Sequence, residues 1–389
     1  MTQFLLPTLA ICLLLLLVKM LNDVDKVTSF LQQKADIFTP SPRSFAFLLT
    51  VKYYIYLPLA VLIFGSTAWF FLKKTNKERD FERQKAVAIS QFDTAKIWCA
   101  PEPLSIKQEK DANLIQYGRD LIAHTSDYLG PQGTVRPISN GMNCQNCHLD
   151  GGAKPFGNNY SAVVATYPKF RARSGATETI VKRVNDCLQR SLNGQELDST
   201  SLEMQAILAY FRWLGQAVPK AKTPKGSGLL KLKFLNRAAN LDSGRLVFIE
   251  KCQRCHGSDG QGLPMPEGNN RRYPPLWGLG SYNEGAGLYR LASFAGYVKA
   301  NMPFGATYDN PQLSDAEAWD VAAFVNTQPR PKHPFLATDF PKIEGKPFDH
   351  PFGPFADTFP ERQHKFGPFQ PIVDFQKRAK DCSSAHKLP

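Results

Sequence analysis

The sequence lacks any block of five like charges and any signature of a nucleic-acid-binding fold, although its formal net charge is +13. Basic residues dispersed in this way argue against nucleic acid as a partner. The positive excess instead favours an anionic substrate or an acidic redox partner. Cysteine and histidine are scarce, with 8 and 7 residues among 389, so the few places where they cluster are informative.

Four cysteines and two histidines form a five-residue motif that occurs twice, as CQNCH at 144–148 and CQRCH at 252–256. The two thiols fall on one side of a turn, where they can add to the vinyl groups of a haem, and the adjacent histidine can ligate the iron. Each copy therefore predicts one covalently bound haem c, with a disulfide or a zinc site as the alternative. The residues predicted to hold the haems are Cys144, Cys147, His148, Cys252, Cys255 and His256.

Two long apolar runs lie near the N-terminus, at Phe4 to Leu21 and at Tyr54 to Leu72. Each has roughly the ~20 residues that a bilayer core requires, which predicts a membrane anchor with two transmembrane helices in residues 1–73. For the first run the alternative is a cleaved signal peptide, but no positively charged segment precedes it.

The haem motifs also indicate a compartment. Haem is attached in this way on the outer face of the bacterial inner membrane, so the haem domains should lie on the periplasmic side. Basic residues give mixed support, because they occur both in the loop at 22–52 and directly after the second apolar run. We let the haem argument decide this prediction.

Residues 74–97 are polar and helix-prone, and we expect them to form a stalk. A first cytochrome c domain is predicted at 98–218. It begins with an amphipathic helix at Asp111–His124, in which Gly118 allows a close helix crossing. It closes with a helix that starts at a capping box in Thr200–Glu203.

The same order of elements repeats in a second predicted cytochrome c domain at 219–332. Leu241 to Glu250 precedes the second haem motif, and a capping box at Ser314–Glu317 starts the last helix. Residues 333–389 are rich in Pro and Phe without periodicity, which predicts an irregular tail, packed across the domains or disordered. The predicted fold is all-α, with two tandem cytochrome c domains between the anchor and the tail.

The sixth ligand of each iron decides the chemistry. For the second haem the candidate is Met302, which precedes Pro303 in an extended loop, and Met265 is the competitor. A thioether ligand raises the reduction potential and is typical of an electron-transfer haem.

For the first haem the soft ligand between the motif and the closing helix is Cys187, whose thiolate would lower the reduction potential. Met142 and Met204 are alternative ligands, whereas His124 is expected to be a surface or helix-end residue. Cys187 is otherwise a buried free thiol, or a disulfide partner of the cysteine at position 99 or 382.

Basic residues surround Cys187 in the sequence, and guanidinium groups suit the binding of tetrahedral oxyanions by forked hydrogen bonds. They are Lys169, Arg171, Arg173, Lys182, Arg183 and Arg190. A solvated face or pairing with haem propionates would explain such a cluster equally well. Beside a thiolate-ligated haem, the cluster suggests an anionic sulfur substrate.

Several segments resemble the dihaem thiosulfate dehydrogenase family. They are residues 143–150, 167–173, 183–194, 274–278, 301–303 and 363–371. The likeness spans about residues 98 to 375. Its most specific part is the Asn-Asp-Cys segment that ends at Cys187, with the Ser and Asn-Gly that follow it.

This resemblance implies an oxidoreductase that interconverts thiosulfate and tetrathionate. It implies ligation by His148 and Cys187 at an active-site haem, and by His256 and Met302 at an exit haem. The residues that match substrate-binding positions are Arg173, Arg183 and Ser191.

The predicted anchor departs from the usual form of the family. It suggests that electrons pass to a membrane respiratory complex or to another cytochrome c. The rival hypothesis is a dihaem electron-relay subunit without a substrate of its own, in which Cys187 ligates no iron. A third is the same site acting on another oxyanion or thiol compound.

Overall fold

The computed structural model describes residues 42–90, 92–263 and 273–385, together with Lys19, Lys26, Ser29, Phe30 and Gln33. Contacts between Cα atoms divide the chain into two compact units, Met1–Gln84 and Lys85–Pro389.

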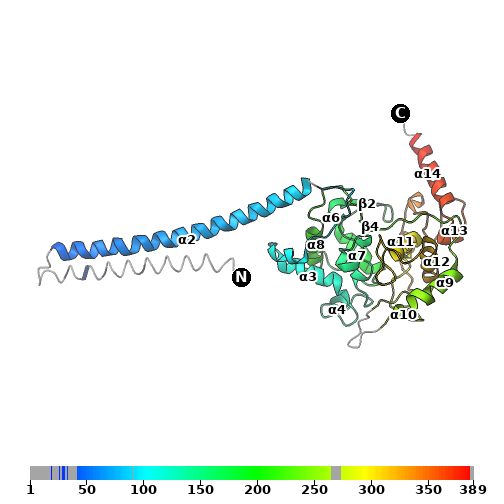
Figure 1. Cartoon of the computed structure of the whole chain (residues 1–389), viewed down its shortest axis with the longest axis horizontal. Helices are drawn as coiled ribbons and strands as arrows, with labels where there is room; N and C mark the ends of the chain where they lie inside the picture. The colour runs from blue at the N-terminus through cyan, green and yellow to red at the C-terminus, as the bar shows by residue number, and fades with distance from the viewer. Residues whose placement is uncertain are drawn as a thin grey trace. The chain divides into compact units, whose positions relative to one another are not determined.

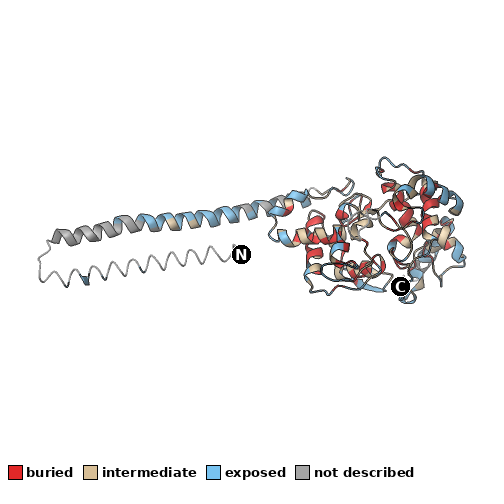
Figure 2. Cartoon of the chain, turned by 90° about the horizontal axis from the view of Figure 1, so that it is seen from below, coloured by how far each residue is buried: buried red, intermediate tan, exposed pale blue. Residues whose placement is uncertain are grey.

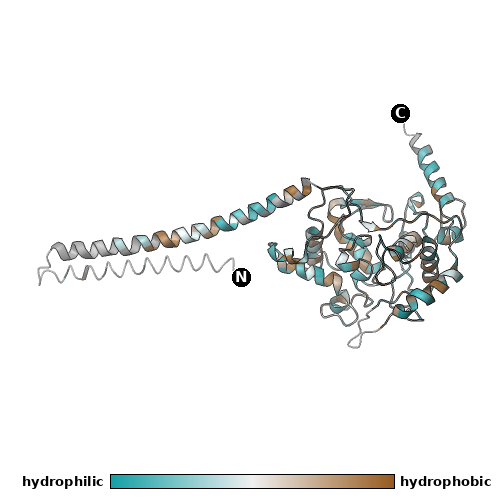
Figure 3. Ribbon diagram, viewed as in Figure 1, coloured by the Kyte–Doolittle hydropathy of each residue, from teal (hydrophilic) through white to brown (hydrophobic). Residues whose placement is uncertain are grey.

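One long helix, α2 at Pro42–Ser90, dominates the described part of the first unit (Figure 1). Its middle carries exposed apolar side chains, and Figure 3 shows brown segments there. Among the described residues, no helix is both long enough and apolar enough to cross a membrane. The transmembrane helix predicted at Tyr54–Leu72 is therefore not confirmed. The span predicted at Phe4–Leu21 lies outside the described residues, apart from Lys19.

The second unit consists mainly of helices joined by loops (Figure 1). Its first half contains η1 Pro103–Gln108, α3 Ala112–Ala123, α4 Thr125–Leu129, η2 Cys144–Asn146, α5 Leu149–Gly152, β1 Gly157–Asn159, α6 Val163–Thr166, β2 Lys169–Arg171, β3 Ala176–Glu178, α7 Ile180–Arg190, α8 Leu202–Leu214 and β4 Gly228–Leu229. The described strands form two small antiparallel pairs, β1 with β4 and β2 with β3.

The second half begins with a continuous helical stretch that leads into the second haem motif. Its elements are α9 Leu241–Val247, the π-helical turn η3 Phe248–Cys252, α10 Gln253–His256, η4 Gly287–Tyr289, α11 Leu291–Asn301, α12 Asp315–Asn326, η5 Leu336–Thr338, η6 Ile343–Gly345, α13 Glu361–Phe366 and α14 Gln370–Ala385.

Two hydrophobic cores lie in this unit, and Figure 2 shows buried residues on the helices of both halves. The first core includes Met204 and Tyr210 of α8, and the second includes Trp319 of α12 and Phe369 of the tail. The domain ends predicted at 98–218 and 219–332 stay predictions.

The same close helix crossing occurs in both cores. A Cβ at Gly118 in α3 would lie 2.0 Å from the backbone oxygen of Ala206 in α8, and a Cβ at Gly244 in α9 would lie 2.0 Å from that of Asp320 in α12. A side-chain carbon cannot come so near a backbone oxygen, so only glycine fits. The prediction for Gly118 is confirmed, and the duplication extends to the packing of the helices.

Helix α12 begins with the predicted capping box. The Ser314 hydroxyl accepts a hydrogen bond from the Glu317 backbone N–H at 3.2 Å, and the Glu317 carboxylate accepts one from the Ser314 N–H at 2.7 Å. Two otherwise unpaired N–H groups of the first turn are satisfied in this way.

The capping box predicted at Thr200–Glu203 is wrong. Helix α8 is capped one residue later, by Ser201, whose hydroxyl accepts from the Met204 N–H at 3.2 Å. A methionine at the third helical position cannot return a bond to the cap, and Glu203 instead accepts from the Tyr117 hydroxyl at 3.0 Å. The local sequence pattern predicted that the Glu203 carboxylate caps the helix, but this carboxylate binds the distant Tyr117 instead.

The tail is not irregular throughout, because it contains the helices α13 and α14. Its expected packing is confirmed: Phe340, Phe369 and Ile372 are buried, and the last two belong to the second core. The Pro-rich composition hid the helices, since Pro360 and Pro371 stand at the start of α13 and in the first turn of α14, where a missing N–H is tolerated.

Candidate active site

Six cysteines in the described part of the chain are free thiols, and Cys99 among them is exposed. The other five are Cys144, Cys147, Cys187, Cys252 and Cys255. A disulfide within either motif is therefore absent from these residues. The described residues also contain no group of three or more His, Cys, Asp and Glu that could hold a metal ion, which gives the zinc alternative no support. Free thiols are what covalent haem attachment requires.

The histidines of both motifs are held in the same way. His148 Nδ1 bonds the backbone oxygen of Asn158 at 2.5 Å, and His256 Nδ1 bonds that of Pro274 at 3.2 Å. A carbonyl only accepts, so Nδ1 carries the proton and the Nε2 lone pair remains available for iron. Burial lowers the pKa of His148 to about 4 and also lowers that of His256, so both rings are neutral at pH 7. Sequence reasoning gave no sign of these two carbonyls.

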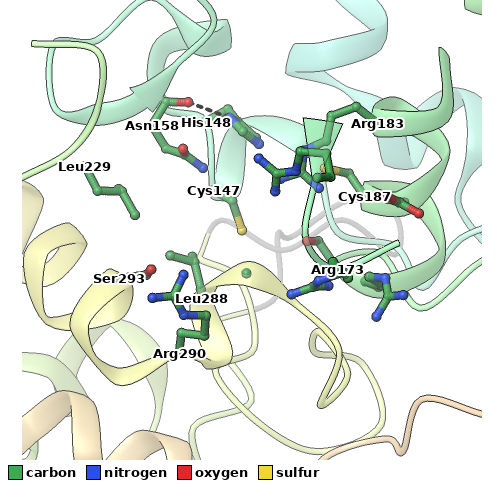
Figure 4. Close-up of a pocket in the computed structure, with 15 residues that line it drawn as sticks. Cys147, His148, Asn158, Arg173, Arg183, Cys187, Leu229, Leu288, Arg290 and Ser293 are labelled. Atoms are coloured by element: carbon green, nitrogen blue, oxygen red, sulfur yellow. Dashed lines mark hydrogen bonds between the residues drawn. The ribbon is translucent and has the colours of Figure 1, made fainter. Parts of the chain in front are cut away.

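The residues predicted to act on a substrate lie together. A cavity of about 180 Å³ is lined by Arg173, Arg183, Cys187 and Ser191, and also by His148 of the first haem motif. Figure 4 shows side chains converging on this cavity from the haem motif, from α7 and from the second half of the unit. Their functional roles stay predictions, but the fold brings all of them to one site.

A second cavity of about 170 Å³ shares His148 and Cys187 with the first and is mostly apolar. Its lining includes Cys144, one of the two motif thiols, and core residues such as Leu129 and Phe211. An apolar lining beside a motif thiol and a histidine with a free Nε2 has the chemistry expected of a haem site. His148 and Cys187 face the same space, as two ligands of one iron would.

Helix α7 places Cys187 and Arg183 one turn apart, so both side chains lie on the same face of the helix. A negative charge on Cys187 would raise the pKa of Arg183 more than burial lowers it. In the described part of the chain, Arg183 has no carboxylate within ion-pair distance. Its positive charge is therefore not offset by an ion pair, unlike the charges of Arg173 and Arg190, which both lie beside Asp339.

Arg173 approaches the cavity from the loop between β2 and β3. Its Nη1 donates to the Gly285 backbone oxygen at 2.7 Å, and its Nε lies 3.8 Å from Asp339 Oδ2. Burial, and then the nearby charge of Arg190, lower the pKa of Arg173 to about 10, so it stays cationic at pH 7.

Only some of the predicted basic residues line the cavity. Arg171 and Arg190 also line the cavity, whereas Lys169 is exposed on β2 and Lys182 pairs with Asp186 along α7. Sequence reasoning missed Arg290, a lining residue from the second half of the unit. No local pattern marks it, because the first-domain residues that share the cavity with it, such as Cys187, lie far away in the chain.

At the second site Met302 follows α11 in an extended conformation, with its N–H bonded to the Val298 oxygen at 2.8 Å. It packs against the second core, as does Cys252. The competitor Met265 lies outside the described residues. The ligand role of Met302 stays a prediction.

Two alternative ligands of the first haem are core residues. Met142 and Met204 are buried in the first core, and neither lines the two cavities. His124 is exposed at the junction of α3 and α4, as expected for a helix-end residue.

Comparisons with known proteins agree with this arrangement. Residues 135–219 match the SoxA/TsdA cytochrome c domain, and residues 241–329 match the cytochrome c family. The two cytochrome c domains each carry one covalently bound haem c. The fold and its paired motifs thus define a dihaem c-type cytochrome that is mostly helical.

The chain is 39% identical over 224 residues to the thiosulfate dehydrogenase of Allochromatium vinosum, covering 76% of that protein and 56% of this chain. It is 35% identical over 232 residues to that of Psychrobacter arcticus, covering 68% of that protein and 59% of this chain. Among solved structures, thiosulfate dehydrogenase (TsdBA) from Marichromatium purpuratum in its "as isolated" form matches with a TM-score of 0.56 and 30% identity. That match covers 61% of this chain and 50% of the other.

The chain therefore belongs to the thiosulfate dehydrogenase family. It is a thiosulfate dehydrogenase-like c-type cytochrome oxidoreductase with two haem c groups.

Proposed function

We propose that this protein interconverts thiosulfate and tetrathionate at the Cys187 cavity. Two thiosulfate ions join through their terminal sulfurs, and two electrons pass by way of the second domain to an external cytochrome c or a membrane respiratory complex. The observation that carries the proposal is a cavity in which a free thiol lies beside arginines and faces the same space as His148.

The arginines hold the substrate. Arg183, with no carboxylate partner among the described residues, and Arg173, fixed through Gly285, present N–H groups that match sulfonate oxygens. The Ser191 hydroxyl lines the same cavity and supplies a neutral donor. Held in this way, the terminal sulfur of thiosulfate is directed toward the Cys187 sulfur.

Cys187 acts as a sulfur nucleophile. A bond forms between its sulfur and the terminal sulfur of one thiosulfate, and two electrons leave. The terminal sulfur of a second thiosulfate then attacks the adduct sulfur that is bonded to Cys187 Sγ. The bond to Sγ breaks, which releases tetrathionate and restores the Cys187 thiolate. When bound, the haems would supply one-electron acceptors. Ligation by Cys187 would lower the reduction potential of the first haem, and ligation by Met302 would raise that of the second, which would favour electron transfer from the first to the second.

The adduct has a direct test. Treating the oxidised chain with thiosulfate and quenching it should add the mass of one thiosulfate to the peptide that contains Cys187. The same treatment of a Cys187→Ser variant should add nothing. An unmodified Cys187 peptide under turnover conditions would exclude this route.

The reaction itself is tested by thiosulfate-dependent reduction of the purified full chain, followed by visible absorbance, beside Cys187→Ala. We expect reduction of the wild type and none of the variant. If thiosulfate reduces neither, although dithionite reduces both haems and tetrathionate cannot reoxidise them, the electron-relay hypothesis is the better account.

We also place the haem domains on the periplasmic side of the bacterial inner membrane, because c-type haem is attached there. Attachment of residues 1–73 to that membrane stays a prediction from the apolar runs. Protease added to intact spheroplasts should remove the haem-bearing part if it is periplasmic. Alkaline extraction of the membranes should leave the chain in the pellet if the anchor is integral, and should release it if it is not.

A further inference from the structure

Arg190 is the last residue of α7 and lines the substrate cavity, although only 8% of its surface is exposed. Its Nη1 and Nη2 donate to the two carboxylate oxygens of Asp339 at 2.8 and 2.7 Å. The backbone also fixes it, since the Arg190 oxygen accepts from the Asn283 N–H at 3.0 Å. The guanidinium is thus held in one orientation at the wall of the cavity.

The third nitrogen of the Arg190 guanidinium, Nε, has no partner among the described residues. It is buried, and no acceptor lies within hydrogen-bond distance in the described part of the chain. A buried donor left unpaired is destabilising, so an acceptor that binds beside this guanidinium would stabilise the site. Because Arg190 lines a cavity with four other arginines, an oxyanion bound there is an acceptor within reach of its guanidinium.

Asp339 comes from the C-terminal tail, 149 residues away in the chain. The tail is fastened at this point, because the Phe340 N–H donates to the Arg173 backbone oxygen at 2.7 Å. The Asp339 carboxylate also lies 3.8 Å from Arg173 Nε. One tail segment thus fixes two arginines of the cavity.

The charge of Asp339 offsets that of Arg190, so Arg190 adds little net attraction for anions. What it offers is a directed N–H group at a fixed position. We propose that Arg190 is a further substrate-binding residue, whose guanidinium donates to a sulfonate oxygen, and that Asp339 is the positioning residue that holds it there. This inference rests on the proposed function of the site.

A haem propionate presents the same oxyanion chemistry as a sulfonate, so the experiment separates the two sources. A donor to the substrate affects KM for thiosulfate, whereas a donor to a propionate affects the midpoint potential of the first haem. Both quantities are measured on each full-length, haem-loaded variant.

The variants are Arg190→Lys, which keeps the charge but has no Nε–H, and Asp339→Asn, which keeps the shape but weakens the fork. Matched controls come from the Arg237–Asp320 pair in the second domain, which does not line the cavity. It has the same two-bond geometry, with hydrogen bonds of 2.9 and 2.8 Å. Arg237→Lys and Asp320→Asn therefore report the general cost of losing such a pair.

We expect KM to rise about tenfold in Arg190→Lys and by a smaller factor in Asp339→Asn, with kcat and the potential of the first haem nearly unchanged. The two controls should leave KM unchanged. An unaltered KM, or a shifted potential with an unaltered KM, would overturn the inference. So would KM changes that the controls reproduce, since these report a structural effect. A wild type that thiosulfate does not reduce would overturn the proposed function itself.

Discussion

The two haem domains share a frame and differ in what surrounds the iron. Both cross their first and last helices at a glycine, Gly118 or Gly244, and both direct the motif histidine with a backbone carbonyl bonded to Nδ1. These shared features serve to bind a haem. They do not determine which reaction the haem takes part in.

The difference lies at the predicted sixth ligand and its neighbours. Cys187 borders a cavity lined by arginines, whereas Met302 follows α11 and packs against an apolar core. One frame therefore surrounds an arginine-lined cavity in the first domain and an apolar environment at Met302 in the second. Under the proposed function, the first is the substrate site and the second is the electron-transfer site. The reaction is determined by a few side chains, not by the fold.

The largest expected effect comes from giving the first site the ligand of the second. In Cys187→Met we expect thiosulfate turnover to fall at least about 10³-fold, because the nucleophilic thiolate is lost. The midpoint potential of the first haem should rise by on the order of 100 mV, as thioether replaces thiolate. Stopped-flow reduction and a spectroelectrochemical titration measure the two changes. Near-normal turnover with a raised potential would contradict a nucleophilic role for Cys187.

Substituting the glycine at either helix crossing should destabilise its own domain, by a similar amount in each. Gly118→Ala and Gly244→Ala place a Cβ against a backbone oxygen, so each should lower the free energy of unfolding by about 2–3 kcal/mol in denaturant titrations. Gly65→Ala in α2 is the control, because its Cβ would meet no atom within 4 Å. That substitution should change stability by less than about 1 kcal/mol, in the stabilising direction. Equal effects of all three would refute the close crossings.

The smallest expected effect distinguishes the two closing helices by pH. The cap bond to Ser314, and then Lys251, lower the pKa of Glu317 to about 2. Because this is below the unfolded value of about 4.3, the stabilisation is complete above that value and is lost as the pH falls through about 2. Glu317 is one-third exposed, so after solvent screening we expect Glu317→Gln to cost about 1 kcal/mol at pH 7 and almost nothing at pH 2. A cost independent of pH would contradict this role of the carboxylate.

Local pattern predicted what local interactions determine. The helix at Ala112–Ala123, the capping box at Ser314–Glu317 and the haem motifs each lie within a few residues and follow from short-range geometry. The grouping of Cys187, Arg173 and Ser191 was also expected from the sequence, in part through family resemblance.

The parts that were missed depend on distant partners. Asp339 binds Arg190, which is 149 residues away in the chain. Glu203 was expected to cap its own helix, but it accepts a hydrogen bond from Tyr117, 86 residues away. Arg290, bonded through Nε to Asp349 at 2.8 Å, reaches the cavity from the second domain. No periodicity marks such contacts, because tertiary packing alone brings them together. The helices of the tail were missed because its composition suggested irregular structure.

The central claim is that Cys187 joins two thiosulfates, and product analysis tests it most directly. The oxidised chain is mixed anaerobically with thiosulfate and an excess of a soluble electron acceptor, and tetrathionate is determined by ion chromatography beside the electrons collected. The account predicts one tetrathionate for every two thiosulfates consumed and two electrons collected, and none from Cys187→Ala. Electrons without tetrathionate, or equal tetrathionate from the variant, would contradict it.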